Sequence, residues 1–161
     1  MWETRPEDWY LGAMEEVGRM QSKFYISAVG HEDMIRALHV ELNIPGAEVK
    51  ELRPNPIDPH PQAERWLWRS PYQVCSGDFP EDELAAYLRE NGHVLSVLKQ
   101  HSAHLRDVGP VIVSLPDQGR AGGYSVSSEL IQLLASANAS LEIDILESPR
   151  NDSAESAPGS N

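Results

Sequence analysis

The segment VGPVIVSLPD, residues 108–117, is an almost unbroken apolar run, and it constrains the fold more than any other part of the chain. The run is long enough for a strand and far short of the roughly eighteen apolar residues that a membrane span needs. A strand without polar alternation is covered on both faces, which places it at the centre of a sheet. The chain therefore needs neighbouring strands and helices that cover this one.

Four other segments are predicted to be strands. Aromatic and β-branched residues dominate KFYISAVG, residues 23–30, and apolar and acidic residues alternate in LEIDILE, residues 141–147. Both patterns are typical of strands. Residues 47–54 and 64–72 have weaker patterns of the same kind.

Three segments are predicted to be helices, because their apolar residues recur at a spacing of three or four. They cover residues 31–42, 78–105 and 127–139. Asp78 and Ser127 are the expected N-caps of the second and third segments, since a short polar side chain there can accept a backbone hydrogen bond.

The order of these elements is β-α-β-β-α-β-α-β, with Asn91-Gly92 kinking or splitting the long central helix. This order predicts an α+β fold: a ferredoxin-like two-layer sandwich with a mostly antiparallel sheet and helices on one face. A length of 161 residues suits one such domain. We expect an N-terminal helical extension at 1–22, a single α+β domain at 23–147 and a disordered tail at 148–161.

The charge balance excludes some partners and favours others. Thirteen Lys and Arg residues face 25 Asp and Glu residues, a formal net charge of −12. This balance disfavours nucleic acid and anionic membranes, whose phosphates need Lys and Arg, and favours a basic protein partner. No signal peptide is recognised, and the single cysteine, Cys75, fits a reducing cytoplasm. The expected location is cytoplasmic.

The glycine-rich stretch GRAGGYSVSS raises the question of a phosphate loop. It lacks the Lys and the spacing of a Walker A motif, and Arg120 alone is a weak phosphate ligand. A turn followed by a helix capped at Ser127 explains the stretch better.

No residue pattern predicts catalysis, a metal or a cofactor. His93, His101 and His104 share one predicted helix, but no cysteine or carboxylate joins them at ligand spacing, so they are interpreted as a solvated helix flank. Asp78 lies near Cys75 and would raise its thiol pKa, which disfavours a nucleophile. The prediction is a non-enzymatic protein, although residues distant in the sequence could still form a hydrolase site.

Four residues are predicted to bind a partner. Trp66 and Trp68, two apart in a strand, project together and could anchor a protein or stack a ligand on an open sheet face. Core packing is the competing interpretation of this pair, and the neighbouring arginines do not outweigh the overall negative charge. Glu142 and Asp144 share one face of the last predicted strand, and its isoleucines lie on the opposite face. These two carboxylates supply the acidic part of the expected surface.

The end of the chain resembles a known family. A glycine-preceded SVSSELIQLLA, a short turn and then LEIDIL resemble the end of a small bacterial α+β family, domain of unknown function 4279. The segments FYISAVGHEDMIRALHVEL, RWLWRS, FPEDELAAYLRENGHVLSVL and PVIVSL follow the family's order, and the resemblance covers roughly residues 23–147. It implies the fold and supplies no catalytic residue. Residues 1–22 and the proline-rich loop 54–62 look atypical of the family.

These observations favour a binding protein. The leading hypothesis is a bacterial immunity protein that neutralises a cognate basic toxin domain, occluding its active site through an acidic, aromatic-anchored surface. The alternative is a small-ligand-binding or regulatory module that uses the open sheet face near the tryptophans.

Overall fold

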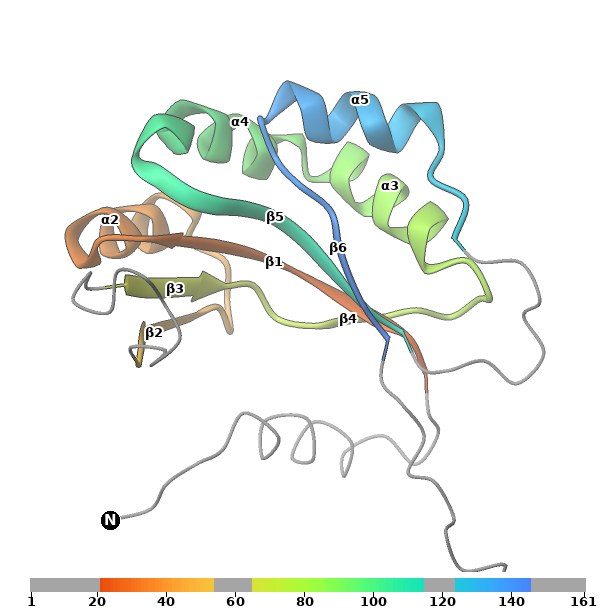
Figure 1. Cartoon of the computed structure of the whole chain (residues 1–161), viewed down its shortest axis with the longest axis horizontal. Coiled ribbons are helices and arrows are strands. Elements are labelled where there is room, and N and C mark those ends of the chain that lie inside the picture. The colour runs from red at the N-terminus through yellow and green to blue at the C-terminus, as the bar shows by residue number, and fades with distance from the viewer. Residues whose placement is uncertain (1–20, 54–64, 115–123, 146–161) are drawn as a thin grey trace, which may run out of the picture.

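The computed structural model of the chain describes residues 21–53, 65–114 and 124–145 and is a two-layer α+β sandwich (Figure 1). Within these residues, a mixed sheet of six strands packs against four α-helices, so the predicted fold class is confirmed. The expected N-terminal extension, the proline-rich loop and the tail lie outside the described residues, as does Arg120 with most of its glycine-rich turn.

The sheet has the strand order β2-β3-β1-β5-β6, and a short sixth strand, β4, pairs with β1 beyond the end of β3. The strands are β1 (Lys23–Gly30), β2 (Glu48–Leu52), β3 (Arg65–Arg69), β4 (Gln73–Val74), β5 (Leu105–Ser114) and β6 (Glu142–Ile145). All pairs are antiparallel except β5 with β6, which run parallel. The first four positions of this order are those of a ferredoxin-like core, and β6 extends it at one edge.

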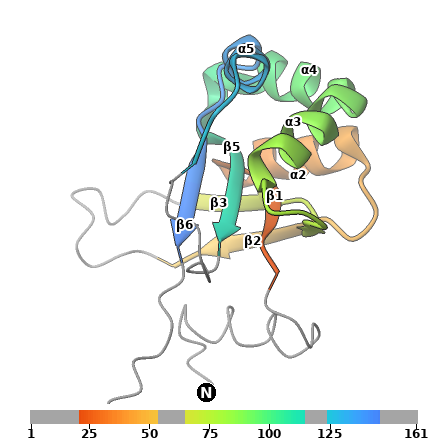
Figure 2. The ribbon, with the colours of Figure 1, turned by 90° about the vertical axis from the view of Figure 1, so that its right-hand side faces the viewer.

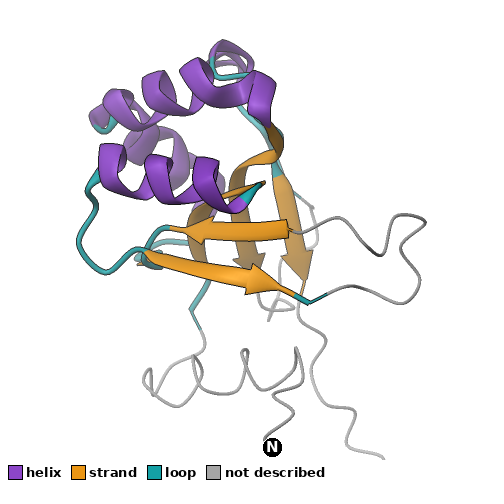
Figure 3. Cartoon of the chain, turned by 90° about the vertical axis from the view of Figure 1, so that its left-hand side faces the viewer, coloured by secondary structure: helices purple, strands orange, loops and turns teal. Residues whose placement is uncertain are grey.

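The helices all lie on one face of the sheet, as the views in Figure 2 and Figure 3 show. They are α2 (Glu32–Leu42), α3 (Pro80–Glu90), α4 (Gly92–His101) and α5 (Ser128–Ser136), and a short 3-10 turn, η1 (Ser102–His104), follows α4. The long predicted helix is split at Asn91-Gly92, as expected. In the described residues the opposite face of the sheet carries no helix, and we call it the helix-free face.

The central strand is β5, in agreement with its apolar sequence. Every residue from Val108 to Ser114 is buried, on both faces of the sheet. The strand begins at Leu105, three residues earlier than its apolar pattern indicates, because Leu105 pairs with Gly30 across a register shift in β1. The core is continuous from this strand and β1 through the inner faces of all four helices.

The two expected helix caps have different outcomes. Ser127 caps α5, since its side chain accepts a hydrogen bond from the Leu130 N–H at 3.1 Å. Asp78 does not cap α3: the N-cap position is Phe79, without a side-chain hydrogen bond, and Pro80 follows where a missing N–H is tolerated. Glu83 instead orders the preceding turn, accepting from the N–H groups of Ser76 and Gly77.

A serine joins β3 to β4 along the same edge of β1. The Ser70 N–H donates to the Ile26 carbonyl oxygen at 2.9 Å, and the Ser70 Oγ accepts from the Ile26 N–H at 2.9 Å. The backbone of Ile26 is therefore satisfied where the ladder changes partner. Among the described residues, no helix has the length and apolar character that crossing a membrane requires.

Candidate functional site

The two tryptophans lie on the covered side of the sheet. Trp68 pairs with Ala28 and Trp66 with Gly30, in the row of β1 residues that faces the helices. Trp68 is 0% exposed, and Trp66 is half-buried with the Arg36 guanidinium 4.9 Å from its ring centroid. The prediction that this pair stands on an open sheet face is therefore wrong, and Trp68 cannot contact a partner in the folded protein. The competing interpretation, core packing, is correct for Trp68.

Glu142 and Asp144 lie on the helix-free face. They pair with Val111 and Val113 of β5, whereas the intervening Ile143 pairs with the fully buried Ile112 on the helix side. Glu142 is exposed and Asp144 is half-buried. The alternation of the sequence therefore assigned these two carboxylates to one shared face, and the structure separates both of them from the tryptophans.

The helix-free face also holds a group of basic and aromatic side chains that we call the basic–aromatic cluster: Lys23, Tyr25, Arg69 and Tyr72. The Arg69 guanidinium lies 4.9 Å from the Tyr72 ring centroid and 5.6 Å from that of Tyr25. The Lys23 ammonium lies 4.2 Å from the Tyr72 centroid, and the two tyrosine rings meet edge to face at 5.1 Å. Cations over aromatic rings attract the ring faces, so these contacts hold the cluster together.

Hydrogen bonds fix Arg69 at the middle of this cluster. Its guanidinium donates to the Tyr72 hydroxyl at 2.9 Å and to a Glu48 carboxylate oxygen at 2.6 Å. The Arg69 side chain is only 14% exposed, whereas that of Glu48 is 56% exposed. Arg69 is therefore a largely desolvated charge in a defined orientation, unlike a solvated surface arginine.

Positive charge accumulates around Arg69. Desolvation by burial, and then the charge of Arg69, lower the pKa of Lys23. The pKa of Lys50, on the neighbouring strand β2, is lowered by the same two causes in the same order; Arg53 lowers it further and Glu48 opposes the shift. Keeping both lysines protonated in neutral solution therefore costs free energy, and a nearby anion would reduce that free-energy cost.

The sequence contained only a partial signal of this cluster. The arginines beside the tryptophans form the densest basic feature in the strand segments, but the sum over the whole chain hid their local excess. Lys23 and Tyr25 come from a different strand some forty residues earlier, and only the pairing of β1 with β3 and β4 brings the groups together.

The structure also shows the surroundings of Cys75 and of the three histidines that the sequence singled out. Burial, and then Glu83 and Glu81, raise the pKa of the Cys75 thiol to about 12, so it stays protonated at neutral pH. His101 pairs with Glu41 at 2.7 Å between the side-chain atoms, while His93 and His104 are exposed. Among residues 21–53, 65–114 and 124–145, no three His, Cys, Asp or Glu side chains are grouped so that they could hold a metal ion.

Comparison with protein-family models finds no match for this chain, and comparisons with curated proteins and with solved structures find none either. The resemblance to domain of unknown function 4279 therefore stays a prediction from the sequence. Function has to be argued from the surface chemistry of the molecule itself.

Proposed function

We propose that this chain is a non-enzymatic binding protein that engages its partner through the helix-free face of the sheet. The supporting observation is the arrangement of charge on that face. The basic–aromatic cluster lies on the side of β3 and β1, and Glu142 and Asp144 lie on β6 at the other side. Ordered charges of both signs on one sheet face suit selective protein recognition, because complementary fields orient the partner and exclude wrong ones.

More specifically, we propose an immunity protein that neutralises a basic toxin domain. The net charge of −12 favours rapid association with a basic partner, and the exposed Glu142 offers it a carboxylate on the helix-free face. Occlusion of the toxin's active site would follow from contact across this face. Trp66 and Trp68 do not belong to this proposed binding surface.

The test is a matched pair of charge reversals. A basic protein captured from native cells at low ionic strength is purified, and its toxic activity and affinity are measured against each variant. E142K/D144K should weaken binding by about tenfold or more and relieve the inhibition, because like charges then face each other. D82K/E90K, at exposed positions of α3 on the helix side, makes the same change in net charge and should leave binding nearly unchanged.

The two variants together test whether the helix-free face is the interface with the toxin. Equal weakening by both would mean that only net charge matters and that the helix-free face is not the interface. Full inhibition by E142K/D144K would contradict the role of β6.

The basic–aromatic cluster favours a second candidate function, a module that binds a small anionic ligand on the same face. The lowered pKa values of Lys23 and Lys50 support it, since an anion beside Arg69 would stabilise all three cations. K23M/K50M should abolish ligand binding in that case while leaving the binding of a basic toxin intact. The two candidates therefore respond to substitutions on different strands of one face.

A further inference from the structure

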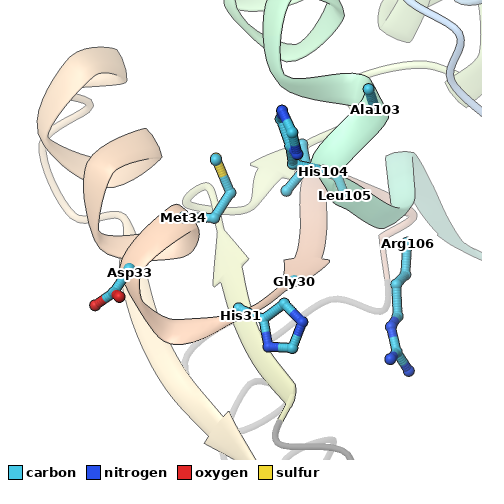
Figure 4. A pocket seen from close by; sticks show the side chains of 8 residues that line it. All are labelled: Gly30, His31, Asp33, Met34, Ala103, His104, Leu105 and Arg106. Atoms are coloured by element: carbon cyan, nitrogen blue, oxygen red, sulfur yellow. The ribbon is translucent and has the colours of Figure 1, made fainter.

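A pocket of about 490 Å³ lies at the end of β1, between the first turn of α2 and the junction of η1 with β5 (Figure 4). Its wall comes from two segments far apart in the sequence: Gly30, His31, Asp33 and Met34 in one, and residues 103–106 in the other. Gly30 permits their close approach, because a Cβ there would lie 3.2 Å from Leu105 Cδ2 and 3.4 Å from the His104 carbonyl oxygen. The pocket shares no residue with the basic–aromatic cluster or with β6.

Three side chains with N–H donors line this pocket: His31, His104 and Arg106. Within the described part of the chain, no hydrogen bond or ion pair engages any of these three side chains. Figure 4 shows Arg106 extending beside the His31 ring, with His104 on the other side of Gly30. Neutral imidazole retains one N–H, and guanidinium always carries several, so the pocket offers donors at neutral pH.

The nearby carboxylates do not neutralise these donors. Asp33 also lines the pocket, but its carboxylate points away from His31 and Arg106 in Figure 4. Glu32 is engaged by Arg36 on its own helix, at 2.7 Å between Nε and Oε1. The pocket is therefore a local concentration of donors in a chain whose formal net charge is −12.

The other side of the pocket is apolar. Met34, Ala103 and Leu105 contribute aliphatic and thioether surface, and the Met34 side chain points toward His104 (Figure 4). The volume falls within the roughly 300–1,000 Å³ of small-molecule sites and exceeds what a bare inorganic anion fills. A fitting ligand therefore joins an anionic group to a compact carbon body.

We propose that this pocket binds a small phosphate monoester. Its phosphate oxygens would accept hydrogen bonds from Arg106, whose planar fork suits phosphate, and from the His31 imidazole beside it (Figure 4). Its organic part would lie against the apolar wall. This site is independent of the proposed function of the helix-free face, because neither set of residues contains a member of the other.

The experiment is an amide NMR titration of the full chain at pH 7 and constant ionic strength, with phenyl phosphate as the probe. Shift changes should cluster at residues 30–34 and 103–106. R106Q and H31Q should each weaken binding by about tenfold. These side chains belong to exposed residues, so the substitutions leave the core intact. Inorganic phosphate should bind more weakly, because it leaves the apolar wall uncovered.

Two control variants match the chemistry outside the pocket. K99Q removes one positive charge and H93Q one imidazole, both at exposed positions of α4, and both should bind phenyl phosphate like the unmodified chain. Equal weakening by these controls, or shift changes spread over basic residues elsewhere, would overturn the site. Inorganic phosphate binding as tightly as phenyl phosphate would overturn the assignment to a monoester.

Discussion

The two sides of strand β3 contrast sharply within five residues. On the helix side, Trp68 is completely buried and Trp66 packs against the core under Arg36. On the helix-free side, Arg69 is held by Glu48 and two tyrosines, and Leu67 is half-buried. One side of the strand is organised by apolar area and the other by charge and aromatic rings.

This contrast teaches where recognition chemistry can reside in such a chain. A tryptophan buries a large apolar area, so a pair of them is drawn to the layer that excludes water. Arginine and lysine cannot be buried in that layer without a partner, so they lie on the opposite face of the sheet. Partner-binding groups are thus expected opposite the most apolar residues of a strand, rather than among them.

The largest effect is expected from Trp68→Ala. It should destabilise the fold by about 3–5 kcal/mol, because it removes the transfer free energy of the indole and leaves a cavity under α2. Urea unfolding followed by circular dichroism gives the change in free energy. Leu67→Ala, on the other side of the same strand, should cost about 1 kcal/mol. Similar losses for both would contradict the asymmetry of β3.

A somewhat smaller effect is expected at the junction of β5 with β6. Gly109 has a φ of +153°, and a Cβ there would collide with the Ser140 carbonyl oxygen. Gly109→Ala should therefore displace Ser140, whose N–H donates to the Val108 carbonyl oxygen at 2.9 Å, and cost about 2–4 kcal/mol. Hydrogen exchange should show β6 amides losing protection while those of β1 and β3 retain it.

The matched control for this substitution is Gly92→Ala. A Cβ at Gly92 has nothing within 4 Å, and alanine suits the start of α4, so stability should rise by up to about 1 kcal/mol. Unchanged protection of β6 in Gly109→Ala would mean that the acidic edge of the helix-free face does not depend on this close approach.

Most of the fold could be predicted because its signals are local. The apolar run of β5, the helical spacing of α2 and α5 and the Ser127 cap each depend on neighbours in the chain. The strand β4 could not be predicted, because two residues carry no pattern and its pairing follows from the Ser70 hydrogen bonds with Ile26. The sequence analysis assigned no direction to β6, because period-two alternation is the same in a parallel and an antiparallel pair.

The candidate site was harder to predict than the fold. Strand alternation correctly grouped Trp66 with Trp68 and Glu142 with Asp144. Alternation does not say which group faces the helices, since that depends on the side from which the connecting segments cross the sheet. For the tryptophans, their apolar area was the better guide, and it pointed inward.

The smallest loss of stability is expected from a substitution on the charged, helix-free side of β3. Arg69→Met removes the hydrogen bonds to Tyr72 and Glu48 and both aromatic contacts, and it should cost about 1–2 kcal/mol. Arg36→Met removes an ion pair with Glu32 from a side chain that is 59% exposed, together with the contact over the Trp66 ring, and should cost about 0.5–1 kcal/mol.

The pKa of Lys23 gives Arg69→Met a second readout, measured by NMR titration of the lysine side chain. Burial is the larger cause of its lowered value and the charge of Arg69 the smaller one, so removing that charge should raise the pKa part of the way toward 10.5. Since a lowered lysine pKa means that the unfolded chain binds more protons, stability rises with pH through the interval below 10.5. That slope should become shallower in Arg69→Met. An unchanged Lys23 pKa would show that burial alone lowers it. Lys23 and Arg69 would then not repel each other measurably, and an anionic ligand would have no such repulsion to relieve.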